Sequence, residues 1–127
     1  MIDREYFIST ILSEFPEFLE FWQEHLRYWD GEVRTVGIDV SAFSSFVISE
    51  ISNMSKEKRQ CVFALVEKSL NYGTEDIKAA VATQFLENLL NAESAKKIKA
   101  EDFIDFLQPE SRKYCEAWDN FTGIKNN

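Results

Sequence analysis

The segment from Thr74 to Leu90, TEDIKAAVATQFLENLL, decides the fold class of this chain. A hydroxyl at Thr74 followed by two acids is typical of a helix start, because the hydroxyl can accept from free backbone N–H groups and the acids suit the positive end of the helix. At about 100° per residue, the apolar side chains sweep more than half of the helix surface. These side chains are Ile77, Val81, Ala82, Phe85, Leu86, Leu89 and Leu90. We therefore predict a central helix that other helices contact on several sides.

Helical periodicity extends over most of the chain, which has only four Gly and two Pro. We expect further helices over residues 3–15, 16–29, from Ser41 onward, 55–72, 101–107 and 109–120, with Gly73 as a C-cap. Residues 32–40, EVRTVGIDV, lack this pattern, and Val36, Ile38 and Val40 alternate at a period of two, so part of the segment could be extended. The predicted fold class is all-α, with one domain over residues 1–127 built as a compact bundle of six to seven helices. A short solenoid-like stack of antiparallel helix pairs is the alternative.

Two uncharged polar rows accompany these helices. The helix expected from Ser41 carries serines opposite its apolar stripe, among them Ser44, Ser45 and Ser49. The central helix carries Gln84, Asn88 and Asn91 along one edge. We expect these amides to mark the border with solvent rather than a recognition site.

The composition supplies material for a core and excludes several classes of protein. Hydrophobic residues make up 45% of the chain and include eleven Phe, which argues against disorder. The acidic start does not resemble a secretory signal and no apolar run is long enough to span a bilayer, so we expect a cytoplasmic protein with no membrane partner. Cys61 and Cys115 lack zinc-site spacing and are expected to be buried free thiols. We expect no metal and no cofactor.

The charge is acidic and unevenly distributed. A net charge of −8, without a dense basic patch, argues against direct binding of nucleic acid. Residues 1–54 hold ten acids and three bases, a net charge of −7, whereas residues 55–127 hold twelve acids and eleven bases, a net charge of −1. This asymmetry favours an acidic face and a basic partner.

No arrangement of residues in the sequence indicates catalysis. His25 is the only imidazole, so a serine or cysteine nucleophile has at most one histidine base, and nothing near it in sequence supports the pair. Phosphate-binding loops, HExxH and EF-hand patterns are absent from the sequence. We therefore expect that the protein is not an enzyme.

The aromatic segment 15–29, FPEFLEFWQEHLRYW, divides into a core stripe and an edge. On a helical projection most of its apolar side chains fall within about 60° on either side of Phe15. This predicted core stripe consists of Phe15, Phe18, Leu19, Trp22, Leu26 and Trp29. Phe21 and Tyr28 fall outside the stripe, and His25 lies at its boundary. Another helix, such as the first, could cover them. Otherwise they are exposed.

If they are exposed, this edge is the candidate partner-binding surface. Phe21 and Tyr28 would be aromatic anchors, with His25 beside them. The charged rim would consist of Glu17, Glu24, Asp30, Glu32 and Asp39, which suits a basic protein.

The C-terminal segment from Pro109 to Gly123, PESRKYCEAWDNFTG, resembles the closing signature of a largely uncharacterised family of small all-α bacterial proteins. In that signature Pro-x-Ser leads into Tyr-Cys-x-x-Trp-Asp-x-Phe-x-Gly. The segment VATQFLENLL, residues 81–90, is similar to a second block of the family. The resemblance implies an all-α domain associated with toxin–immunity loci, and it transfers no catalytic residues. In physical terms, Tyr114, Cys115 and Trp118 share one face, and Gly123 would close the helix.

The expected function is that of an immunity protein, which neutralises a cognate toxin domain by forming a stoichiometric complex. The toxin could be a basic nuclease, which an acidic surface would neutralise by competing with phosphate. A helical adaptor or regulatory module without a toxin partner is the alternative. A small enzyme or ligand-binding protein with a pocket among the aromatic side chains is a third interpretation.

Overall fold

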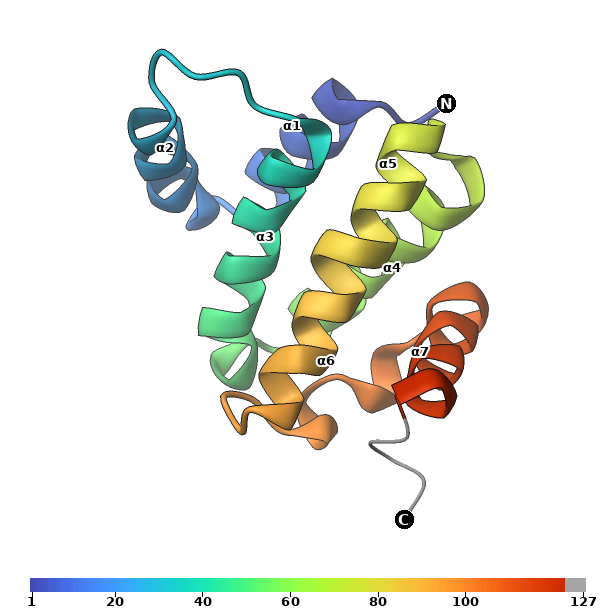
Figure 1. Cartoon of the computed structure of the whole chain (residues 1–127). Helices are drawn as coiled ribbons and strands as arrows, with labels where there is room; N and C mark the ends of the chain where they lie inside the picture. Colours follow the sequence, from blue (N-terminus) through green and yellow to red (C-terminus); the bar gives the residue numbers. More distant parts are fainter. Residues whose placement is uncertain (123–127) are drawn as a thin grey trace.

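The computed structural model describes residues 1–122, with side chains up to residue 119, and it is all-α (Figure 1). Seven α-helices occur in this part of the chain, and they form a compact bundle. They are α1 (Arg4–Glu14), α2 (Phe18–Tyr28), α3 (Val36–Glu50), α4 (Lys56–Tyr72), α5 (Glu75–Ala80), α6 (Glu87–Ser94) and α7 (Pro109–Thr122). Short 3-10 turns are η1 (Ile51–Asn53), η3 (Ala100–Asp102) and η4 (Ile104–Phe106). The predicted fold class is therefore confirmed.

The central helix predicted from Thr74 is a continuous rod made of α5, the π-helical segment η2 (Val81–Leu86) and α6. In Figure 1 it runs beside α3 and in front of α4, and η2 also contacts α7. Ile77, Val81, Phe85 and Leu89 follow each other at intervals of four and are all fully buried. In an α-helix such a row drifts by about 40° at each step, because a turn holds 3.6 residues. The wider π turn removes part of this drift and keeps the row facing the core.

Phenylalanines from the first three helices and from η2 form one core. Phe43 of α3 lies at its centre: its ring centroid is 5.9 Å from that of Phe7 in α1, 6.0 Å from Phe18 in α2 and 5.5 Å from Phe85 in η2. Edge-to-face and offset stacked arrangements of this kind add to the free energy of apolar burial. The N-terminal helices are thereby fixed to the central rod.

Helix α3 begins six residues earlier than predicted. Thr35, not Ser41, is its N-cap, and its hydroxyl accepts from the backbone N–H of Ile38 at 3.1 Å. The expectation of an extended segment is therefore wrong for residues 36–40, because Val36 and Val40 are also one helical turn apart and face the core. The Ser41 hydroxyl instead donates to the carbonyl of Ile38 at 2.6 Å.

Gly73 is the C-cap of α4, as predicted, but it does not adopt a left-handed conformation. Its φ is −76° and its ψ is 161°. A Cβ at this position would lie 2.4 Å from the carbonyl oxygen of Ser69 and 2.8 Å from Cγ2 of Ile77, so close approach explains the glycine. Ile2 pairs with the same turn: its N–H donates to Tyr72 and its carbonyl accepts from Thr74.

The C-terminal helix α7 is held by a buried carboxylate of α4. The backbone N–H groups of Glu110 and Ser111 donate to the two oxygens of Glu67 at 2.7 and 3.0 Å. The Ser111 hydroxyl completes the start of the helix by accepting from the N–H of Gln108. Cys115 is buried, whereas Tyr114 is half-buried and donates to Glu87. Gly123, expected to close this helix, lies outside the described residues.

Within residues 1–122, no helix is long and apolar enough to cross a membrane.

Candidate partner-binding surface

Helix α2 is rotated about its axis relative to the sequence expectation. Phe15 and Phe18 are fully buried and Trp22, Leu26 and Trp29 are half-buried, but Leu19 is 47% exposed. The rotation brings Phe21 to within 5.2 Å of the Phe46 ring on α3 and turns His25 towards Asp39. The predicted core stripe is therefore wrong at Leu19, because contacts with α3 compete with the simple apolar pattern.

Phe21 and Tyr28 lie at the edge of α2, and helix α1 does not cover them. Tyr28 is 82% exposed, and its ring lies edge-on to the neighbouring Trp29 ring at a centroid distance of 5.6 Å. Phe21 is 36% exposed, because one of its faces packs on Phe46. The question left open by the sequence is thus answered for these two rings: Tyr28 is accessible, and Phe21 is partly so.

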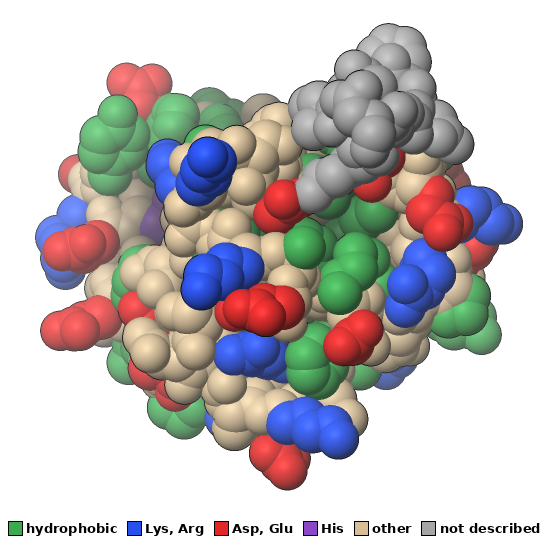
Figure 2. Space-filling model, turned by 90° about the horizontal axis from the view of Figure 1, so that it is seen from below, with side chains coloured by type: hydrophobic (Ala, Val, Ile, Leu, Met, Phe, Trp, Pro, Cys, Tyr) green, Lys and Arg blue, Asp and Glu red, His purple; other side chains and the backbone are tan. Residues whose placement is uncertain are grey.

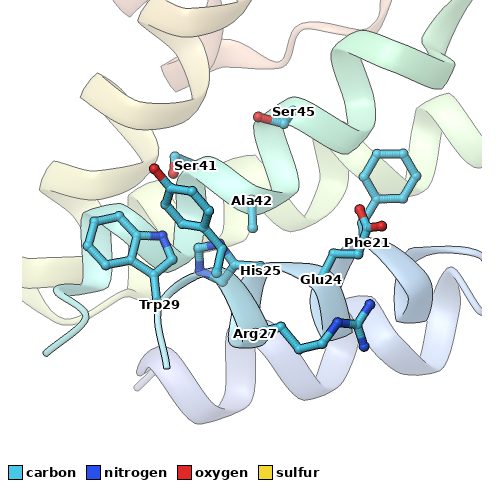
Figure 3. Close-up of a pocket in the computed structure, with 9 residues that line it drawn as sticks. Phe21, Glu24, His25, Arg27, Trp29, Ser41, Ala42 and Ser45 are labelled. Atoms are coloured by element: carbon cyan, nitrogen blue, oxygen red, sulfur yellow. The ribbon is translucent and has the colours of Figure 1, made fainter. Parts of the chain in front are cut away.

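A groove of about 640 Å³ separates this edge of α2 from α3. Figure 3 shows Phe21, Glu24, His25 and Trp29 on the α2 side, facing Ser41, Ala42 and Ser45 of α3. Tyr28 also lines the groove. The aromatic side of this groove could be predicted from the residues of α2, whereas its α3 side depends on how α2 packs against α3.

The surface around α2 is strongly acidic. Between residues 14 and 32, every acid is exposed and Arg27 is the only Lys or Arg. The acids are Glu14, Glu17, Glu20, Glu24, Asp30 and Glu32. By contrast, Figure 2 shows acidic and basic side chains interspersed on the end of the molecule that is lowest in Figure 1. Of the acidic rim residues named from the sequence, Glu17, Glu24, Asp30 and Glu32 are on the surface.

Asp39 is not a rim residue, because it is only 1% exposed. Its Oδ1 lies 2.8 Å from Nε of Arg34 and 2.9 Å from Nε2 of His25, and its Oδ2 lies 3.5 Å from an Arg4 guanidinium nitrogen. Asp39 therefore joins α1, α2, the loop before α3 and α3 itself. The signal that could have placed it was Thr35: a helix capped there puts Asp39 on the same face as Phe43 and Phe46.

His25 is fixed by its surroundings. Besides the contact with Asp39, its ring stacks on Trp22 at a centroid distance of 5.2 Å, and its side chain is 11% exposed. These contacts make His25 a part of the wall of the groove and leave little of it for direct contact with a partner.

The two cysteines are free, and Cys115 is protected. Burial raises the pKa of the Cys115 thiol to about 12, and the nearby Asp119 acts in the same direction. Cys61 is half-buried. No group of three or more His, Cys, Asp or Glu that could hold a metal ion occurs among the residues with described positions.

The fold and the α2 edge define a small helical protein with an exposed surface of aromatic and acidic side chains. Residues 8–123 match the family described as Domain of unknown function (DUF7674), so the chain belongs to this family. A search of curated proteins gave no match, and neither did a search of solved structures. The family description gives no activity.

Proposed function

We propose that this protein is an immunity protein, which binds a cognate bacterial toxin domain and neutralises it through the edge of α2. The observation that carries the proposal is the exposure of Tyr28 on a helix edge flanked by acids. Large aromatic side chains dominate the binding energy of many protein interfaces, and a tyrosine that is 82% exposed leaves its ring available to a partner.

The charge of the edge supports a basic partner. Glu17, Phe21, Glu24 and Tyr28 follow one another at intervals of four, three and four residues, so they form a ridge along α2 in which acids and rings alternate. Complementary charge accelerates association and orients the partner. A toxin domain that acts on nucleic acid carries basic side chains for the phosphates, and this ridge would compete for them. The resemblance of the C-terminal segment to proteins from toxin–immunity loci agrees with this function.

The test is co-expression with the protein encoded by the neighbouring open reading frame, scoring complex formation and rescue of growth from its toxicity. In the triple variant Glu17→Lys, Glu24→Lys, Glu32→Lys, we expect affinity for the toxin domain to fall at least about tenfold at low salt, because attraction becomes repulsion. The matched control is Glu101→Lys, Asp105→Lys, Glu116→Lys, which changes the net charge equally at exposed positions elsewhere. If both triple variants bind equally well, the acidic edge is not the interface.

A second pair of variants tests the aromatic anchor. We expect Tyr28→Ala to weaken binding without affecting the fold. Tyr72→Ala, at a tyrosine that is 66% exposed on α4, should leave binding unchanged. A wild-type protein that binds only a non-toxic partner would indicate the alternative function, a helical adaptor.

A further inference from the structure

A second groove continues from the first along the outer face of α3. It has a volume of about 540 Å³ and separates α3 from α6. The serine row of α3 and the asparagine row of the central helix face each other across it, with Ser45 and Ser49 on one side and Asn88 and Asn91 on the other. Ser45 lines both grooves, so together they form one trough. We call it the α3 trough: its floor is α3 from Ser41 to Ser49, and its walls are α2 and α6.

The floor of the α3 trough is suited to close packing. Its serine side chains are small, and two helices approach to 8–10 Å when the side chains between them allow it. The hydroxyls of Ser41 and Ser44 already donate to the carbonyls of Ile38 and Ser41, at 2.6 and 3.0 Å. Ser44 is only 1% exposed, so the accessible serines of the floor are Ser41, Ser45 and Ser49. The Ser49 hydroxyl donates to Glu50 at 3.0 Å, so a partner can cover Ser41 and Ser49 without leaving their hydroxyls unpaired.

The walls of the α3 trough differ in chemistry. The α2 wall presents Phe21, Tyr28, Glu24 and Arg27, and the six exposed acids between residues 14 and 32 outweigh this one base, so the surface around α2 is negative. The α6 wall presents the neutral Asn88 and Asn91. Lys97 is the only base that lines the groove beside α6. Basic side chains of an occupant are thus attracted to the α2 side, while its opposite side meets neutral amides.

Resting on the proposed function, we infer that the α3 trough receives an amphipathic helix of the toxin domain, with basic side chains towards α2 and small apolar ones on α3. The floor from Ser41 to Ser49 is about 12 Å long, which corresponds to two helical turns. A strand is a poorer fit, because within residues 1–122 no strand offers an edge for pairing.

The test blocks the floor without touching the acids or rings. Ser45→Trp places an indole in the α3 trough, and Ser49→Trp does so one turn further along α3. The control is Ala64→Trp, at an exposed position of α4. Circular dichroism and thermal unfolding check that each variant folds, and titration calorimetry measures binding of the protein encoded by the neighbouring open reading frame. We expect at least about a hundredfold weaker binding for both serine variants and no change for the control.

The outcomes separate the two proposals. If the folded serine variants lose binding and the Ala64→Trp control does not, the result supports the α3 trough as the binding site of the helix. If wild type binds and protects while Ser45→Trp and Ser49→Trp bind equally well, the trough is wrong but the immunity function stands. If wild type does not bind or protect, both proposals fall.

Discussion

Among single residues, Asp39 determines how the candidate edge of α2 is held against α3. It is a buried carboxylate to which Arg34, His25 and Arg4 converge from three different segments. Buried charges are costly unless they are paired, and here the pairing also fixes α2 against α3. Asp39, which the sequence suggested as a contact for a partner, therefore lies beneath the surface of α2 and supports it from within.

We predict that Asp39→Ala lowers the free energy of unfolding by about 2–4 kcal/mol, because it leaves the basic groups around it without their acceptor. Asp39→Asn should lower the free energy of unfolding by less than Asp39→Ala does, since the amide oxygen can still accept a hydrogen bond. Urea unfolding followed by circular dichroism measures both, and Asp30→Ala, at an exposed acid, is the control. A loss for Asp39→Ala no larger than that of the control would show that the cluster contributes nothing to stability.

Cys115 should be unreactive in the native protein. Its thiol pKa is raised from 9.0 to about 12 by burial, so it stays protonated at pH 8, and the thiolate is the nucleophile. Because the folded-state pKa is the higher one, the associated stability is complete below pH 9 and is lost as the pH rises towards 12. In a Cys61→Ser variant, we expect a thiol reagent at pH 8 to label Cys115 only as fast as the protein unfolds. Rapid labelling under native conditions would contradict this burial.

At the scale of elements, α7 depends on Glu67 of α4. The carboxylate accepts hydrogen bonds from two backbone N–H groups in the first turn of α7, where no preceding helical carbonyl is present to accept them. Its negative charge also suits the positive end of α7. The contact joins segments 43 residues apart, so it anchors the C-terminal helix to the rest of the bundle.

We predict that Glu67→Gln lowers the free energy of local unfolding of α7 by about 1–3 kcal/mol, because the amide offers one acceptor oxygen where two are needed. Hydrogen exchange should accelerate in residues 109–119 and change little in α3. Glu116→Gln, on the exposed side of α7, should have little effect. Equal acceleration throughout the molecule would instead mean that α7 and the core unfold together.

Local sequence patterns fail to predict the structure where tertiary contacts outweigh them. Helical periodicity was sufficient to predict the central rod and the helices α1 and α4, because their buried faces are broad and apolar. The rotation of α2 could not be read from its own residues, since it depends on Phe46 and Asp39 of α3. The start of α3 was missed because Val36, Ile38 and Val40 fit both a strand and a helix. The acids and rings of the candidate edge were visible in the sequence, but its α3 side required the fold.

Considered as a whole molecule, the protein has most of its negative charge at one edge. Residues 1–54 carry a net charge of −7, and the acids between residues 14 and 32 are all exposed on or beside α2. The remaining net charge of −1 belongs to residues 55–127, where the two signs are nearly balanced. Such an uneven distribution orients an approaching basic protein before contact, and salt reduces the effect.

The π-helical segment η2 has a consequence for how the chain can change in length. In an ordinary helix, deleting one residue turns everything downstream by about 100°, which would carry the buried face of α6 away from α3. A π turn already holds a surplus residue, so a deletion between Val81 and Leu86 can convert it into an α turn with little rotation. The central rod can therefore lose one residue within η2, in the middle of the bundle, while α6 keeps its buried face towards α3.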